Sequence, residues 1–148
     1  MMRVGLAMLQ GARHEHEEAL LSIARDLQYE VEVVQLRKGE DLDSSIHGLI
    51  LPGGESTTMR IASRSEGLLD SIFNWMNEHP RRPVLGTCAG AILLAMPSNN
   101  RDPYIRAAIS RNAWGRQRQS FEADIEVELE RLETRGVSVQ RQPDAYGH

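Results

Sequence analysis

The sequence contains one cysteine and one lysine among its 148 residues, and each scarcity excludes a class of protein. The single cysteine, Cys88, cannot form an internal disulfide, so the disulfide framework of small secreted domains does not apply. The single lysine, Lys38, lies well before the glycine-rich residues 52–58, which therefore lack the lysine that a phosphate-binding P-loop requires. Nucleotide binding is disfavoured, and the lone thiol of Cys88 must be explained by its surroundings.

Long apolar runs and clustered basic charge are also absent. The apolar stretches at 48–52 and 89–96 fall far short of the roughly 20 residues that a membrane-spanning helix needs. The N-terminus lacks the basic region, apolar run and cleavage site of a signal peptide. The 17 basic and 21 acidic residues give a net charge of −4, and the basic residues are scattered rather than aligned in a stripe. We therefore expect a cytoplasmic protein whose partners include neither a nucleic acid nor a membrane.

The order of apolar segments predicts one α/β domain over residues 1–148, with only a weak pattern in 131–148. Strands alternating with helices indicate right-handed βαβ units, hence a mainly parallel sheet with helices on both faces. The predicted strands are 3–9, 31–36, 46–51, 83–86, 104–109 and 123–129. The predicted helices are 12–28, 57–77 with a break near Gly67, and 89–96.

The segment Gly86-Thr87-Cys88-Ala89-Gly90 joins a short strand to an apolar helix and has the form of a nucleophile elbow with cysteine in place of serine. The glycines allow a sharp turn, and the N–H of Ala89 would point toward a developing oxyanion. The alternative is a small buried hydrophobic residue, because free cysteine is often buried. The glycines favour a nucleophile.

The glycine-rich residues 52–58 follow another predicted strand. Ligands of open parallel sheets bind outside the carboxyl ends of the strands, so Gly53, Gly54 and Cys88 are predicted on one edge. The loop would offer a backbone N–H opposite the elbow, and Glu55 could meet a substrate ammonium group. Taken alone, the loop is also compatible with a plain strand-to-helix turn.

Four segments together resemble the PdxT family, the glutaminase subunit of pyridoxal 5′-phosphate synthase. They are Met8-Leu9-Gln10-Gly11 with Glu15-His16, Leu51-Pro52-Gly53-Gly54-Glu55-Ser56-Thr57-Thr58-Met59-Arg60, the elbow, and Arg111-Asn112-Ala113-Trp114-Gly115-Arg116-Gln117 with Ser120-Phe121-Glu122-Ala123. The resemblance spans roughly residues 2–129. It implies a flavodoxin-like, three-layer α/β/α fold of the class I glutamine amidotransferase type. The loop disfavours other thiol enzymes of the same broad fold.

The resemblance also implies a role for each matching residue, with L-glutamine as substrate and the synthase subunit of the PdxS family as partner. No cofactor and no metal are expected. The implied roles are nucleophile for Cys88, substrate binding for Gly54, Glu55, Ser56 and Arg111, an oxyanion hole formed by Gly54 and Ala89, and a place near the oxyanion on the synthase-facing side for Gln10.

The family's catalytic His-x-Glu pair comes from a Phe-His-Pro-Glu-like segment near the C-terminus, and the 148 residues end before it. We therefore expect negligible turnover by these residues alone, with reactivity of Cys88 toward electrophiles preserved. The alternative is an inactive truncated subunit that only binds the synthase. His14 and His16 are expected on a solvated helix face, because i, i+2 ligands diverge on a helix and the Glu-His of the family here is not catalytic.

Overall fold

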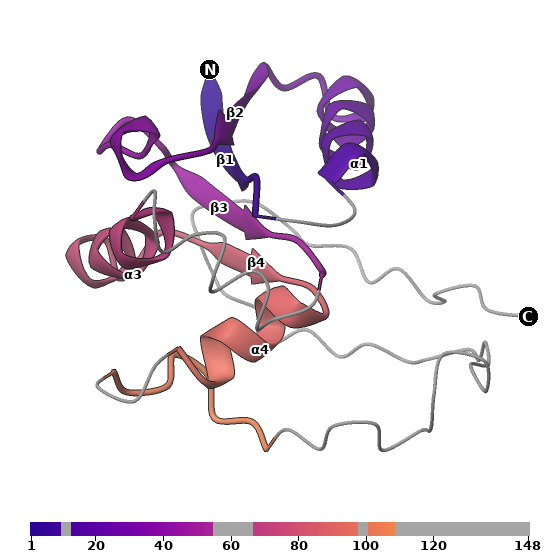
Figure 1. The fold of residues 1–148 in the computed structure, drawn as a ribbon. Helices are drawn as coiled ribbons and strands as arrows, with labels where there is room; N and C mark the ends of the chain where they lie inside the picture. Colours follow the sequence, from indigo (N-terminus) through magenta and orange to yellow (C-terminus); the bar gives the residue numbers. More distant parts are fainter. Residues whose placement is uncertain (10–12, 55–66, 98–100, 109–148) are drawn as a thin grey trace, which may run out of the picture. The chain divides into compact units, whose positions relative to one another are not determined.

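The computed structural model describes residues 1–9, 13–54, 67–97 and 101–108 (Figure 1). The predicted strand at 123–129, the weakly patterned 131–148 and the first part of the predicted helix at 57–77 lie outside these residues, so the single-domain prediction for 1–148 stays a prediction. The elements, in chain order, are β1 (Met2–Ala7), α1 (Arg13–Asp26), β2 (Val31–Leu36), the 3-10 helix η1 (Gly39–Asp41), β3 (Gly48–Leu51), α3 (Leu68–Glu78), β4 (Val84–Gly86) and α4 (Ala89–Ala95).

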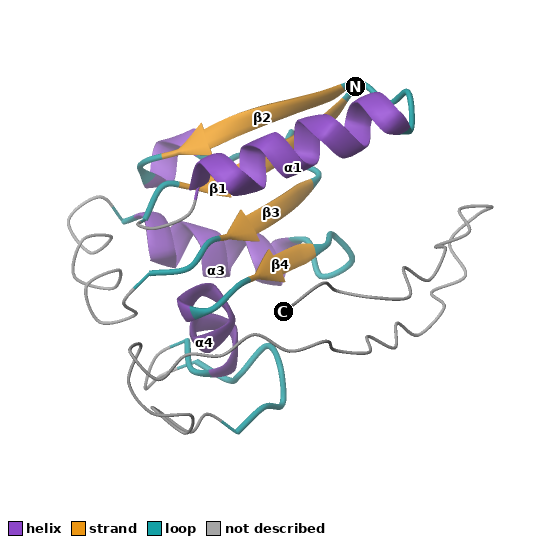
Figure 2. Ribbon diagram, turned by 90° about the vertical axis from the view of Figure 1, so that its right-hand side faces the viewer, coloured by secondary structure: helices purple, strands orange, loops and turns teal. Residues whose placement is uncertain are grey.

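The four strands form one parallel sheet in the order β2-β1-β3-β4. The sheet confirms the predicted parallel topology, and β2 has the predicted bounds because its β-branched run is flanked by polar turn residues. In Figure 2 the arrowheads point the same way, so the carboxyl ends of the strands share one edge. The carboxyl edge carries the residues that follow β3 and β4.

Helices cover both faces of the sheet, as predicted. Side chains alternate along a strand, so successive residues of β3 pack into different layers. Leu49 and Leu51 join a core with α3 and α4, whereas Ile50 joins a smaller cluster that includes Leu20 of α1. Figure 2 shows α1 and α3 on opposite sides of the strands. This three-layer arrangement is the predicted α/β class.

Helix α3 begins after Gly67, whose φ of 65° is a left-handed conformation that glycine adopts without strain. The predicted apolar face of this helix is confirmed, with Leu68, Leu69, Ile72 and Phe73 buried and Met76 half-buried against the same core. Trp75 was not predicted in that face, yet it is 3% exposed. Its indole N–H donates to the carbonyl oxygen of Asp43 at 3.0 Å, which satisfies the one polar group that burial would otherwise leave unpaired.

Helix α1 forms where its apolar spacing predicts, but that spacing overstates its burial. Ala24 is buried, whereas Ile23 and Leu27 are 55% and 60% exposed. No helix within residues 13–54, 67–97 and 101–108 is long and apolar enough to cross a membrane.

The predicted strand at 104–109 is wrong for the part that the structure describes, since 104–108 form no strand. The N–H of Tyr104 instead donates to the Leu94 carbonyl oxygen at 2.9 Å. The Tyr104 ring stacks on Phe73 of α3, with ring centroids 5.6 Å apart, and the Arg101 guanidinium lies 5.2 Å from the Phe73 ring centroid. Packing onto two helices decides the backbone here and overrides the strand propensity of the segment.

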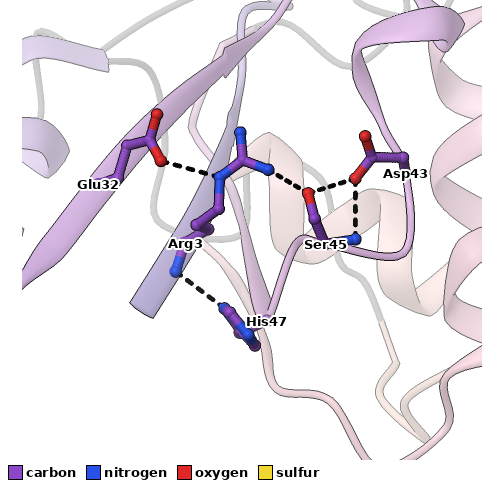
Figure 3. A network of polar contacts seen from close by, with 5 residues as sticks. All are labelled: Arg3, Glu32, Asp43, Ser45 and His47. Carbon is purple, nitrogen blue, oxygen red and sulfur yellow. Dashed lines mark hydrogen bonds and ion pairs between the residues drawn. The ribbon is translucent and has the colours of Figure 1, made fainter. Parts of the chain in front are cut away.

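A polar network ties together the amino ends of three strands (Figure 3). Arg3 Nε donates to the Glu32 carboxylate at 2.8 Å, and its Nη1 donates to the Ser45 hydroxyl. The backbone of Arg3 exchanges hydrogen bonds with His47, whose Nδ1 accepts the Arg3 N–H at 2.9 Å and whose N–H donates to the Arg3 carbonyl oxygen at 2.8 Å. Asp43 accepts hydrogen bonds from the Ser45 hydroxyl and N–H, which lower the pKa of this carboxyl. The network fixes the sheet at the edge opposite Cys88.

Candidate active site

Cys88 lies between β4 and α4. Its backbone conformation, with φ 51° and ψ −115°, is one that non-glycine residues rarely adopt. Such a conformation costs of order 1–3 kcal/mol and persists only where the surroundings hold it. The residue is exposed, which does not fit the alternative of a buried structural cysteine. An exposed thiol on a strained strand-to-helix turn is the geometry of a nucleophile elbow.

The flanking glycines are required by close backbone approach. A Cβ at Gly86 would lie 2.8 Å from the carbonyl carbon of Gly90, so the turn cannot close around a larger residue. A Cβ at Gly90 would collide with the carbonyl oxygen of Leu51 in β3. The pattern of one glycine two residues before Cys88 and another two residues after it therefore reflects the packing of α4 against the end of β3.

The elbow stands beside the glycine-rich loop, as the shared-edge prediction requires. Leu51 pairs with Gly86 in the sheet, and the Thr87 N–H donates to the Leu51 carbonyl oxygen at 3.0 Å. A Cβ at Gly53 would lie 3.2 Å from the Cβ and 3.9 Å from the Sγ of Cys88. The end of β3 and the first residues of the loop therefore approach Cys88 closely, with glycine backbone facing the thiol.

The two predicted oxyanion donors have defined places. Ala89 is the first residue of α4 and is buried, and Gly54 follows Gly53 with φ 144°. The structure therefore brings Gly54, Cys88 and Ala89 to one edge. The other predicted site residues, Gln10, Glu55, Ser56 and Arg111, lie outside the described residues.

His16 is the residue that sequence reasoning missed. It was predicted on a solvated face together with His14, but only His14 is exposed. His16 is half-buried, and its Nε2 lies 3.0 Å from the Thr87 hydroxyl oxygen, one residue before Cys88. The signal that could have found it is topological, because the first turns of a helix after β1 lie at the edge where β4 ends.

Metal ligation has no support in the part of the chain that the structure describes. Within that part, no three His, Cys, Asp or Glu side chains gather closely enough to hold an ion. The geometry fits thiol chemistry supported by backbone N–H groups.

A sequence profile of the SNO glutamine amidotransferase family matches residues 6–142. The chain belongs to this family. The match covers every predicted site residue, from Gln10 to Arg111, and agrees with the resemblance described above. The parallel sheet with helices on both faces is the flavodoxin-like fold predicted for a class I glutamine amidotransferase.

Similar family members include proteins named pyridoxal 5′-phosphate synthase subunit PdxT. The protein of Pyrobaculum neutrophilum is 41% identical over 136 residues, covering 86% of this chain and 66% of that protein. For Korarchaeum cryptofilum the identity is 37% over 139 residues, covering 86% and 67%. For Carboxydothermus hydrogenoformans it is 42% over 135 residues, covering 85% and 63%. The chain thus spans about two thirds of the length of these family members.

The fold is also similar to a solved structure described as a crystal structure of glutamine amidotransferase. The two share 40% sequence identity and superpose with a TM-score of 0.63, over 84% of this chain and 64% of that one.

Proposed function

We propose that the chain carries the thiol nucleophile of the glutaminase subunit of a pyridoxal 5′-phosphate synthase, a subunit that hydrolyses L-glutamine and passes ammonia to the synthase subunit. The observation that carries the proposal is the exposed Cys88 thiol on a strained turn, beside the bare backbone of Gly53 and Gly54. The names of the similar family members support the choice of substrate and partner.

The proposed reaction begins with attack of the Cys88 thiolate on the side-chain carboxamide carbon of glutamine. The S–C bond forms as the carbonyl electrons move to oxygen, and the N–H groups of Gly54 and Ala89 stabilise that oxyanion. The C–N bond then breaks, and the nitrogen leaves as ammonia after accepting the proton that the Cys88 thiol gave up, which water can carry. Water hydrolyses the resulting thioester, releasing glutamate and restoring the thiol.

The remaining site residues complete the proposal. Gly54, Glu55, Ser56 and Arg111 contact glutamine, with Glu55 and Arg111 at its charged end. Gln10 stands near the oxyanion on the synthase-facing side. The ammonia is consumed by the synthase subunit, so the two proteins form a complex. A cytoplasmic location is part of the same proposal.

The experiment is alkylation by 6-diazo-5-oxo-L-norleucine, a diazoketone with the shape of glutamine. Attack by Cys88 forms an S–CH2 bond as N2 leaves and the thiol proton goes to the diazo carbon. Because Cys88 is the only cysteine, intact-mass spectrometry reports thiol modification at one site, and peptide mapping confirms it. L-glutamine should slow the reaction, whereas D-glutamine should not.

The matched control is Cys88→Ala, which should acquire no adduct. Equal rates of labelling with and without L-glutamine would falsify a glutamine site at this thiol. The partner is tested by gel filtration of the chain with a purified pyridoxal 5′-phosphate synthase subunit. Failure to co-elute would remove the synthase from the proposal but leave the thiol chemistry.

A further inference from the structure

Thr87, the residue before the thiol, is fixed through three of its polar groups. Its N–H donates to the Leu51 carbonyl oxygen at 3.0 Å, and its carbonyl oxygen accepts the Gly90 N–H at 2.9 Å. Its side-chain hydroxyl lies 3.0 Å from Nε2 of His16. The two backbone bonds come from the sheet and the turn itself, whereas the side-chain bond comes from α1, 71 residues earlier in the sequence.

The topology of the sheet explains how two residues so far apart in the sequence come into contact. β1 and β4 flank β3 in the sheet, and α1 starts at the carboxyl edge of β1. The first turns of α1 therefore stand at the same edge as the elbow, and the imidazole of His16 is long enough to bridge to it. Both side chains are half-buried, so the bond is partly shielded from water and from screening by solvent.

Cys88 needs support of this kind because its own conformation is unfavourable. A non-glycine residue at φ 51° relaxes unless its neighbours are held. Thr87 shares a peptide bond with Cys88, so a fixed Thr87 side chain limits how far that peptide can rotate. Rotation of the peptide would move the thiol away from its present place beside Gly53.

We propose that His16 is a positioning residue for Cys88, which acts through the Thr87 hydroxyl to hold the elbow in the geometry that attacks glutamine. The inference rests on the proposed function and adds a residue to it. His16 does not touch the substrate in this scheme, and the imidazole serves as a hydrogen-bond partner in either tautomer.

The test compares two electrophiles at the single thiol. The diazoketone must be oriented by the site, whereas iodoacetamide needs only an accessible thiol. Thr87→Val keeps the shape of the side chain but removes the hydroxyl, and His16→Ala removes the imidazole. Each should slow diazoketone labelling by about three- to tenfold, the effect of one lost hydrogen bond, and leave iodoacetamide labelling unchanged.

Three controls separate positioning from a loss of folding. Thr87→Ser keeps the hydroxyl and should restore the rate, and His14→Ala changes an exposed residue of the same helix and should have no effect. The double variant His16→Ala/Thr87→Val should be no slower than the slower single variant, because both changes remove the same bond. Urea unfolding of each variant verifies that it is folded at the assay temperature.

The outcomes distinguish this inference from the function it rests on. Equal diazoketone rates for the unsubstituted chain and all variants would overturn the role of His16 alone. Equal slowing with both reagents, or additive effects in the double variant, would also overturn it, since these indicate altered accessibility or independent roles. No glutamine-sensitive labelling of the unsubstituted chain would overturn the proposed function, and the inference with it.

Discussion

The carbonyl oxygen of Leu51 accepts the Thr87 N–H at 3.0 Å and also faces the Cα of Gly90, where it occupies the space that a Cβ would need. One backbone atom of β3 thus contacts both ends of the elbow. The turn that presents Cys88 is shaped by the neighbouring strand as much as by its own sequence.

This contact predicts that Gly90→Ala is strongly destabilising. The added methyl must displace the backbone of β3 or α4, and overpacking of this kind costs about 3 kcal/mol. Urea unfolding measures the change in the free energy of unfolding. The matched control is Gly67→Asn, because a Cβ at Gly67 meets nothing within 4 Å and asparagine tolerates the left-handed φ of 65°. A loss in the control as large as that in Gly90→Ala would contradict the steric explanation.

The strain at Cys88 predicts that Cys88→Gly is more stable than Cys88→Ala, by about 1 kcal/mol. Both variants lack the thiol, but only glycine adopts φ 51° and ψ −115° without a steric penalty. The comparison requires denaturant unfolding of the two variants under identical conditions. If Cys88→Ala proves the more stable, the backbone at this position is not strained.

The buried indole of Trp75 predicts a loss of about 1–2 kcal/mol for Trp75→Phe. The substitution leaves the Asp43 carbonyl oxygen without its 3.0 Å donor, and it replaces the indole that lies 5.7 Å from the Arg82 guanidinium by a smaller phenyl ring. Tyr104→Phe serves as the comparison, because its hydroxyl bonds involve a part-exposed side chain. Equal stability of Trp75→Phe and the unsubstituted chain would show that the indole bond contributes nothing.

The polar network at the amino edge predicts a loss of stability in acid. The Ser45 hydroxyl and N–H hold the pKa of Asp43 below its ordinary value of 3.8. A carboxyl with a lowered pKa in the folded state stabilises it fully above the unfolded value, and this contribution disappears as pH falls through the folded pKa. The urea concentration at the unfolding midpoint should therefore decrease as the pH is lowered below about 4. The decrease should be smaller in Asp43→Asn.

Asp41 also contributes to the acid dependence, because the backbone N–H groups of Arg37 and Lys38 lower its pKa. Asp43→Asn should consequently remove only part of the acid dependence, and the double variant Asp41→Asn/Asp43→Asn should remove more. A midpoint with the same pH dependence in all three proteins would exclude both carboxyls as its source.

The fold was predictable where local pattern and tertiary packing agree. β2 coincides with its β-branched run at 31–36, and the apolar face of α3 follows its helical spacing. The prediction failed at 104–108, where stacking of Tyr104 on Phe73 outweighs local propensity. Contacts between elements distant in sequence are not encoded in a local pattern.

The site was predictable in part for the same reason. The elbow and the glycine-rich loop each have a local signature, and the parallel topology puts them side by side. The bond between His16 and Thr87 has no such signature, because it depends on where α1 and β4 lie relative to β3. The local sequence alone predicts that a histidine in the first turns of a helix is exposed, and only the arrangement of the strands shows that His16 is half-buried.

The pairing of Leu51 with Gly86 links this chemistry to the alignment of two strands. A shift of β4 by one residue along β3 would reverse which face each side chain points to and would separate Thr87 from both Leu51 and His16. Helix and strand content would barely change in such a misaligned chain, so circular dichroism would not detect it. The rate at which a glutamine-shaped reagent captures the single thiol would detect it, which makes Cys88 a quality check for refolded preparations.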